Sequence, residues 1–283
     1  MKVGIIANPH KPGAVTTYGR LVAALGQRGI EWSVEEETAK LVGGEGLAGR
    51  KLAEVSDVIV VLGGDGTMLH AMATLDGTET PVAGVNIGTL GFLTSCTDDE
   101  LEEFCDALKT GTFHLSPRTL ISATIVRGDG ESKEYLALNE AVLARGQTGR
   151  LVSMKATVGG DLLNRYRADG LIVATPTGST AYSLSAGGPL ISPSAGVFVI
   201  TPICPHTLSQ RSLVVDDSAE IELAPDGLED GAMLFTVDGR DCDEIGATDR
   251  VVIRKAGRHF NLIRLEGRTF YGALRQKLNW RGG

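Results

Sequence analysis

The chain has 283 residues, enough for two domains of ordinary size, and 42% of them are hydrophobic, which supports a substantial core. Charged residues make up 22% of the chain, a share that argues against global disorder. The formal net charge of −8 disfavours nonspecific binding to nucleic acids and to anionic membranes. An anionic ligand would therefore have to be held by local backbone amides, by a metal ion or by selected Arg and Lys side chains.

The four cysteines form no CxxC pair and the histidines form no HxxxH cluster, so we expect no structural zinc site and assign no metal ligand. Free thiols are typical of a reducing cytosol. The first residues, MKVGIIANP, are interpreted as a strand rather than a signal peptide, and no segment approaches the ~20 apolar residues of a membrane span. We expect a cytoplasmic protein that binds neither nucleic acid nor membrane.

The first part of the chain alternates strands with helices. The predicted strands are Lys2–Ala7, Ile30–Val34, Val58–Leu62 and Pro81–Asn86. The predicted helices are Thr17–Gln27, Leu47–Val55, Thr67–Leu75 and Asp98–Lys109. Thr97 and Glu100 are spaced as a capping box before the last of these helices. The alternation predicts a Rossmann-like α/β domain with a parallel sheet over residues 1–118.

After residue 118 the pattern changes to closely spaced strands separated by Gly and Asp turns. The predicted strands are Leu120–Val126, Tyr135–Leu143, Val152–Val158, Leu171–Thr175, Val197–Ile203, Ser212–Val215, Glu220–Leu223, Met233–Val237, Arg250–Arg254 and Phe260–Arg264. This spacing predicts a β-rich, sandwich-like domain over residues 119–266. The amphipathic tail Thr269–Trp280 predicts a C-terminal helix, in a last segment 267–283 that packs back on the N-terminal domain.

The segment Gly63-Gly64-Asp65-Gly66-Thr67 is the most informative motif of the chain. Its glycines let backbone amides approach a ligand, and the helix that follows favours anions at its N-terminus. Asp65 stands at the carboxyl end of a predicted strand, where open α/β sheets bind their ligands. One carboxylate among such amides suggests a base or a metal-linked group in phosphoryl transfer. The alternative is a tight turn in which Asp65 caps the helix.

Two further glycine motifs lie in this half of the chain. Gly88–Leu93 follows the Pro81–Asn86 strand and forms a loop at the same sheet edge, where Phe92 either packs into the core or contacts a flat ligand ring. Gly44–Gly49 matches GxGxxG, but the charged residues before it form no convincing strand, and we interpret it as a flexible loop entering a short helix. Neither a Walker A loop nor a GxSxG elbow is present.

Polar residues also interrupt the β-rich half. Asn139-Glu140 breaks an otherwise apolar strand, and a buried amide or acid costs several kcal/mol if it is unpaired. This pair is either a ligand contact or a bulge or sheet-edge pair. The segment Ala168–Gly188 crowds hydroxyl groups around a Pro-Gly turn, where they could hold ribose or phosphate oxygens, and its Tyr182 could stack on a base. The alternative there is a Ser/Thr-rich helix cap.

Taken together, these motifs resemble the NAD kinase family, and the resemblance extends over essentially the whole chain. The motifs that carry it are Gly63–Thr67 (GGDGT), Asn139-Glu140, Asp169-Gly170, Thr175–Tyr182 (TPTGSTAY), Ile203–Ser209 (ICPHTLS), Asp238-Gly239 and Leu274–Leu278 (LRQKL). The resemblance implies transfer of the γ-phosphoryl group of ATP to the 2′-hydroxyl of the adenosine ribose of NAD. It also implies an enzyme that assembles as a homodimer or homotetramer.

The resemblance carries roles over to particular residues. Asp65 would approach the ribose hydroxyl as a base or metal-linked carboxylate, with Gly66 and Thr67 at the phosphates. Asn139 and Glu140 would hold NAD, Asp169 would bind the nicotinamide ribose or amide, and the adenosine site would be formed by Thr177, Thr180, Ala181 and Tyr182. Phe92 is a further candidate contact that comes from its place in the Gly88–Leu93 loop and not from the resemblance. Mg²⁺ would accompany ATP and bind largely through its phosphates.

The chemistry of these residue types fits such a transfer. A ribose hydroxyl is a poor nucleophile, so a general base helps by roughly 10²–10⁴-fold. Phosphoryl transfer is otherwise mostly positioning and charge neutralisation. Two alternatives use the same motifs: a lipid or small-alcohol kinase built on the GGDGT loop, and a non-catalytic sensor of NAD(H) or NADP(H).

Overall fold

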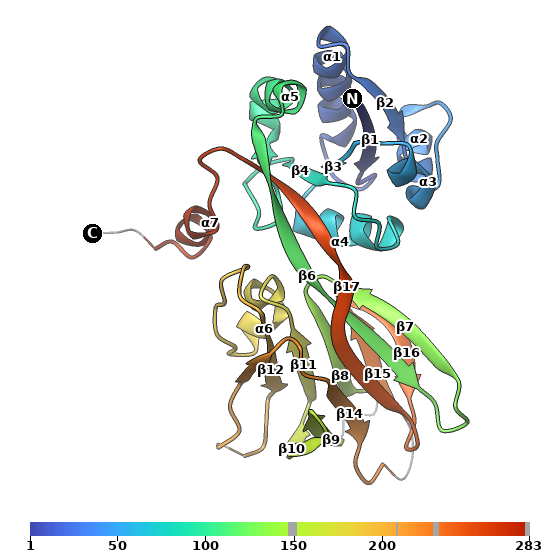
Figure 1. Cartoon of the computed structure of the whole chain (residues 1–283), viewed down its shortest axis with the longest axis vertical. Coiled ribbons are helices and arrows are strands. Elements are labelled where there is room, and N and C mark those ends of the chain that lie inside the picture. The colour runs from blue at the N-terminus through green and yellow to red at the C-terminus, as the bar shows by residue number, and fades with distance from the viewer. Residues whose placement is uncertain (147–151, 208, 229–231, 281–283) are drawn as a thin grey trace. The chain divides into compact units, whose positions relative to one another are not determined.

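The computed structural model describes residues 1–146, 152–207, 209–228 and 232–280, and the chain forms two compact units (Figure 1). The first unit comprises Met1–Arg118 and His259–Gly283, and the second comprises Thr119–Arg258. The chain passes from one unit to the other within two long strands, β6 (Phe113–Val126) and β17 (Arg250–Leu265).

The first unit is built on a parallel sheet of apolar strands. These strands are β1 (Lys2–Ala7), β2 (Glu31–Val34), β3 (Val58–Leu62) and β4 (Val82–Asn86), in the order β4-β3-β1-β2. Every residue of β3 and β4 is buried, as expected where both faces of a parallel sheet are covered. The last part of β17 adds a further parallel strand beside β4 through Leu262 and Val82, and the short β5 (Cys96–Thr97) also pairs with β4.

The helices of this unit are α1 (Ala14–Gln27), α2 (Glu36–Val42), α3 (Gly49–Glu54), α4 (Asp65–Thr74), α5 (Leu101–Thr110) and α7 (Phe270–Lys277). Arg28 links α1 to α5 through hydrogen bonds to Asp106 and to the Glu102 carbonyl, and the two helices lie side by side in Figure 1. The predicted capping box of Thr97 and Glu100 is confirmed, at a 3₁₀ turn, Asp98–Glu100, that leads into α5.

Helix α2 was not predicted, because its charged residues look like a loop in the sequence. Glu35 caps it by accepting a hydrogen bond from the Thr38 N–H at 3.0 Å. The GxGxxG match at 44–49 therefore follows a helix rather than a strand, which is not the context of a dinucleotide fingerprint.

The second unit consists of two antiparallel sheets packed face to face. The strands that complete them are β7 (Ser132–Ala137), β8 (Glu140–Arg145), β9 (Val152–Val158), β10 (Asp161–Ala168), β11 (Gly170–Ala174), β12 (Val197–Ile203), β13 (Leu213–Asp216), β14 (Ile221–Pro225), β15 (Met233–Val237) and β16 (Arg240–Ile245). One sheet has the order β13-β12-β11-β8-β15-β16, and the other contains β10, β9, β14 and β17, with β6 and β7. One hydrophobic cluster joins them, with Leu143 and Phe235 from the first sheet and Met154 and Ile253 from the second.

The expected combination of an α/β domain, a β-sandwich-like domain and a C-terminal helix is thus confirmed. Some strands differ from the prediction. Arg250–Leu265 is one strand instead of two, because its charged central residues lie mostly on exposed positions of an extended chain. Its last residues, 259–265, belong to the first unit, whereas the sequence-based boundary placed them in the β-rich domain. Strands β10 and β16 were not predicted.

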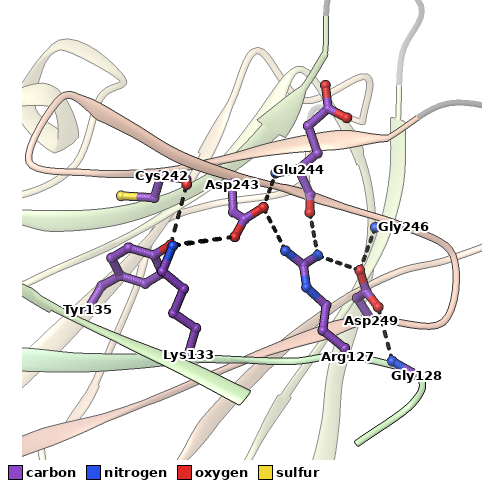
Figure 2. A network of polar contacts seen from close by, with 9 residues as sticks. All are labelled: Arg127, Gly128, Lys133, Tyr135, Cys242, Asp243, Glu244, Gly246 and Asp249. Carbon is purple, nitrogen blue, oxygen red and sulfur yellow. Dashed lines mark hydrogen bonds and ion pairs between the residues drawn. The ribbon is translucent and has the colours of Figure 1, made fainter. Parts of the chain in front are cut away.

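A network of ion pairs ties the turn after β16 to β6 within the second unit (Figure 2). Arg127 contacts the carboxylate of Asp243 at 2.6 Å and that of Asp249 at 2.7 Å. Lys133 lies over the ring of Tyr135, whose hydroxyl donates to the Cys242 carbonyl at 3.3 Å. Burial raises the pKa of both carboxyls, but the hydrogen bonds and charge of Arg127, together with backbone N–H groups, outweigh it and lower each pKa. Arg127, Lys133, Asp243 and Asp249 thus each have a partner of opposite charge.

Across the described ranges of the chain, no helix is both long and apolar enough to cross a membrane.

Candidate active site

Asp65 lies where β3 ends and α4 begins. The N-cap of α4 is Gly64, so Asp65 is the first residue of the helix and not its cap. Its carboxylate accepts two backbone hydrogen bonds, from the Phe92 N–H at 3.0 Å and from the Leu93 N–H at 2.9 Å. The structure therefore brings together the two loops that the sequence placed at one sheet edge.

Two glycines permit this close approach. A Cβ atom at Gly91 would lie 2.1 Å from Oδ1 of Asp65, and one at Gly63 would lie 2.1 Å from Oγ1 of Thr67. Gly66, in contrast, is exposed, and no atom lies within 4 Å of the position of its Cβ. The space beside the Cα atom of Gly66 is thus open.

The carboxyl edge of the parallel sheet carries further polar side chains. Thr67 is buried, and its Oγ1 accepts a hydrogen bond from Nδ2 of Asn8, the residue that follows β1, at 3.3 Å. Asn86, the last residue of β4, is also buried and donates to the Thr89 carbonyl. The sequence analysis did not single out either asparagine; the available signal was a polar residue at the carboxyl end of a buried parallel strand.

Phe92 is half-buried and packs against Phe270 of α7, with ring centroids 6.2 Å apart. This contact places α7 on the loop that holds Asp65. Part of the Phe92 ring stays accessible.

Arg264, near the end of β17, is a buried residue that sequence reasoning missed. Its guanidinium donates to the carbonyl oxygens of Phe92 at 2.5 Å and Thr94 at 3.1 Å. Burial lowers its pKa, and the negative charge of Asp65 acts in the opposite direction.

In the second unit, the predicted single strand Tyr135–Leu143 is divided into β7 and β8, so that prediction was wrong. The cause is Asp238, whose carboxylate accepts hydrogen bonds from three consecutive backbone N–H groups. The donors are Leu138 at 2.8 Å, Asn139 at 2.8 Å and Glu140 at 3.1 Å. A carboxylate that bonds three successive amides prevents these amides from pairing with a neighbouring strand.

Asp238 reaches this position from a tight turn between β15 and β16. It has φ of 49° and is followed by Gly239 with φ of 73°, so both residues are left-handed. Asp-Gly is favoured in two-residue hairpin turns of this kind. The same dipeptide thus closes a hairpin and binds the backbone around Asn139.

Glu140 is buried beside this anion. Burial raises the pKa of its carboxyl to about 8, the charge of Asp238 acts in the same direction, and a hydrogen bond from the Tyr182 backbone opposes them. Its Oε2 atom has no hydrogen-bond partner. A buried polar atom without a partner is uncommon in native proteins and fits an atom that a ligand would satisfy. At neutral pH this carboxyl is protonated and can donate a hydrogen bond.

The hydroxyl-rich turn lies directly beside Glu140. It contains a 3₁₀ turn, Gly178–Thr180, and the short helix α6 (Tyr182–Ser185). Thr180 donates to the carbonyl of the buried Thr177 at 3.1 Å, while Ala181 is half-buried and the Tyr182 side chain is 46% exposed. A Cβ at Gly178 would lie 2.1 Å from the Asn139 carbonyl oxygen, so the turn packs tightly on the Asn139-Glu140 segment.

Asp169 lies at the opposite end of β11 from this group. Glu140 pairs with Ala174, whereas Asp169 precedes Gly170 and forms an ion pair with Arg145 at 3.4 Å. At about 3.3 Å per residue, the length of β11 separates Asp169 from the level of Glu140 by about 16 Å. The structure therefore does not bring Asp169 together with Glu140 and Tyr182.

One motif residue, Leu208 of the segment 203–209, lies outside the described residues. Among the residues that the structure does describe, no group of three or more His, Cys, Asp or Glu side chains could hold a metal ion.

Comparisons with known proteins match both halves of the chain. A family model described as the ATP-NAD kinase N-terminal domain matches residues 3–113, and one described as the ATP-NAD kinase C-terminal domain matches residues 138–265. An NAD kinase from Geobacter metallireducens is 39% identical over 279 residues, covering 99% of this chain and 98% of the relative. An NAD kinase from Caldanaerobacter subterraneus is 39% identical over 285 residues, with 99% of each chain covered.

Solved structures resemble the chain over its full length. Yeast NADH kinase in complex with NADH superposes with a TM-score of 0.91 at 25% identity, covering 100% of this chain and 89% of that one. An NAD kinase from Archaeoglobus fulgidus in complex with ATP gives a TM-score of 0.76 at 24% identity and covers 100% of both chains, a likeness that concerns the fold.

Proposed function

The chain belongs to the NAD kinase family, whose enzymes phosphorylate NAD to NADP with ATP, and from this premise we propose that Asp65 is the general base toward the 2′-hydroxyl of the adenosine ribose. The observation that carries the proposal is the carboxylate itself, fixed by two backbone N–H groups at the carboxyl end of β3. A base must be held in place to accept a proton as the nucleophile attacks, and such help is worth roughly 10²–10⁴-fold.

The phosphates of the donor would lie at Gly66 and Thr67, at the N-terminal end of α4. Gly66 is exposed and has open space at its Cβ position, and the helix N-terminus favours negative charge. The half-buried ring of Phe92 would contact a flat ring of the ligand with the part that Phe270 leaves accessible.

The dinucleotide would be held by Asn139 and Glu140, with its adenosine against the turn of Thr177, Thr180, Ala181 and Tyr182. Support comes from the unpartnered Oε2 of the buried Glu140, a proton donor for a ligand oxygen, and from the exposed ring of Tyr182 beside it. Asp169, at the far end of β11, would contact the nicotinamide ribose or amide.

Mg²⁺ would arrive with ATP, since the described residues include no cluster of three ligating side chains and Mg²⁺ is commonly bound through phosphates and water. Asp65 is the carboxylate that could contact it there, and the ion would neutralise phosphate charge during the transfer. We also propose a cytoplasmic homodimer or homotetramer.

The test is conversion of NAD to NADP by the purified protein with Mg-ATP, beside the Asp65→Ala variant. We expect the wild-type protein to turn over and the variant to be strongly impaired; equal rates would refute the role of Asp65. NADH in place of NAD, and polyphosphate in place of ATP, define the acceptor and the donor. Activity on diacylglycerol or sphingoid bases with none on NAD, or dinucleotide binding without turnover, would contradict the proposal.

A further inference from the structure

The guanidinium of Arg264 and the carboxylate of Asp65 bind opposite sides of the same short backbone segment. Arg264 donates to the carbonyl oxygens of Phe92 and Thr94. Asp65 accepts from the N–H groups of Phe92 and Leu93. All of these residues belong to the first unit, although Arg264 is 172 residues away from Phe92 in the chain.

One peptide group connects the two side chains directly. The Phe92 carbonyl and the Leu93 N–H belong to the same peptide unit, which is planar and trans, so they point in opposite directions. The oxygen of this unit bonds Arg264 at 2.5 Å and its N–H bonds Asp65 at 2.9 Å. The orientation that Arg264 gives to this plane therefore determines where the hydrogen bond to Asp65 points.

The surrounding loop is held by additional hydrogen bonds. The Gly91 N–H donates to Oγ1 of Thr94 at 2.8 Å, and the Ser95 hydroxyl donates to the Ile263 carbonyl at 2.6 Å. The first bond closes the loop around the Phe92–Leu93 peptide, and the second fastens the end of the loop to β17.

The positive charge of Arg264 lies in a buried position, where it destabilises the folded protein unless it is compensated. The side chain is buried, and Arg118, which is also buried, adds like-charge repulsion; burial and the charge of Arg264 together lower the pKa of Arg118 to about 9. A buried charge without a counter-ion is strongly destabilising. The carboxylate that interacts with Arg264 is Asp65. A neutral donor could bind the two carbonyl groups equally well. The positive charge of Arg264 therefore points to its interaction with the carboxylate of Asp65.

We propose that Arg264 is a positioning residue for phosphoryl transfer, which orients the carboxylate of Asp65 through the Phe92–Leu93 peptide. The proposal rests on the role of Asp65 as the base. It predicts an effect on kcat rather than on the KM for NAD, because Arg264 is assigned no contact with the dinucleotide.

The experiment is a double-mutant cycle on NADP formation with the full chain, using Arg264→Met, Asp65→Ala and both together. We expect Arg264→Met to lower kcat about 10- to 100-fold with little change in KM, since a displacement of about 1 Å can cost 10²-fold. In the Asp65→Ala background the same substitution should change kcat by less than about twofold, because no carboxylate remains to be oriented. Arg264→Lys keeps the charge and one donor group, so its kcat should lie between those of the wild-type protein and Arg264→Met.

Arg28→Met is the matched control. It removes another arginine of the same unit, whose partners are Glu102 and Asp106, and should leave kcat unchanged. If Arg264→Met does not fold, Thr94→Val tests the same loop by removing the hydroxyl that accepts the Gly91 N–H, and it should lower kcat in the same direction.

If Arg264→Met lowered kcat by the same factor in the wild-type protein and in the Asp65→Ala variant, Arg264 would act only on the stability of the structure. This result would overturn the inference. An unchanged kcat in Arg264→Met and in Thr94→Val would overturn it as well. A wild-type rate in Asp65→Ala by itself would instead refute the proposed function on which the inference rests.

Discussion

The two acidic groups proposed to act on the dinucleotide lie in opposite environments. Asp65 is partly exposed, and both of its carboxylate oxygens accept backbone N–H groups. Glu140 is buried next to a second acid, Asp238, and one of its oxygens has no partner. The first arrangement holds a carboxylate in a fixed direction as an acceptor. The second raises the pKa of Glu140 and favours its neutral form, which has a proton to donate.

Under the proposed function, the two environments would suit two different roles, a base at Asp65 and a ligand contact at Glu140. A base must be directed at the proton that it accepts, and two backbone N–H groups hold the carboxylate of Asp65 in one direction. A group that recognises a ligand hydroxyl or phosphate oxygen can stay protonated if burial and a like charge prevent ionisation. The Arg127 network provides a reference, because its carboxylates are paired and their pKa values are lowered.

The largest effect that tests this comparison is expected for Asp65→Asn. The substitution preserves size but removes the basic carboxylate, and the amide can accept from only one of the two backbone N–H groups, so kcat should fall about 10²–10⁴-fold. Affinity for NAD, measured by calorimetry, should change little. Glu140→Ala should show the reverse, a weaker affinity with a smaller loss of kcat. If both variants mainly lost kcat, or both mainly lost affinity for NAD, the separate roles of Asp65 and Glu140 would be refuted.

Gly91→Ala should come next. The added Cβ would lie 2.1 Å from Oδ1 of Asp65, so the carboxylate has to move, and a displacement of about 1 Å can cost 10²-fold in rate. We expect a loss of that order in kcat with NAD affinity retained. Gly19→Ala, in α1 with no atom within 4 Å of the new Cβ, is the control and should be slightly more stable than the wild-type protein. A wild-type kcat for Gly91→Ala would show that the position of Asp65 is not critical.

Glu140→Gln should change the pH dependence of stability. The carboxyl ionises near 4.5 in the unfolded chain and at about 8 in the folded protein. Between these values the folded state binds more protons than the unfolded state, so the free energy of unfolding decreases as pH rises, by on the order of a few kcal/mol.

In the Gln variant the part of this decrease that comes from Glu140 should be absent, as denaturant unfolding between about pH 5 and about pH 9 would reveal. Burial also raises the pKa of Asp238, so a smaller decrease should remain. Asp238 is present in both proteins and serves as the internal reference. Parallel stability curves for the two proteins would contradict a protonated Glu140.

The smallest effect is expected for Arg127→Ala, which breaks the paired network of Figure 2. The loss of unfolding free energy should be on the order of 1 kcal/mol, because the groups are partly exposed, and kcat should not change. Since Arg127 lowers the pKa of Asp243 and Asp249, its contribution is present above the ordinary Asp pKa of 3.8 and is lost as pH falls through the lower folded values. A difference in melting temperature that stays constant down to strongly acidic pH would contradict this.

Local signals predicted the first unit well. The strand Val58–Leu62 was predicted with its observed bounds, because it is a purely apolar run ended by glycines, and the capping box at Thr97 was read from two residues. Asp65 could be identified since motif and strand end coincide in the sequence. Helix α2 could not, because its cap, Glu35, looks like one more charged residue of a loop.

What could not be predicted depends on contacts between distant parts of the chain. The break between β7 and β8 is produced by Asp238, 100 residues after Leu138. Arg264 reaches the Phe92 carbonyl across 172 residues, and nothing near it in sequence distinguishes it from other arginines of β17. The raised pKa of Glu140 has the same origin, since it requires both burial and the approach of Asp238.

The hairpin turn at Asp238 also bears on how the protein is made. During synthesis the Asn139-Glu140 segment emerges about a hundred residues before the aspartate that bonds its amides, at a translation rate of roughly 5–20 residues per second. The nascent chain therefore spends several seconds without the contact that sets this bend. The bend is completed only when the β15–β16 hairpin has left the ribosome and docked, so it is a late product of folding.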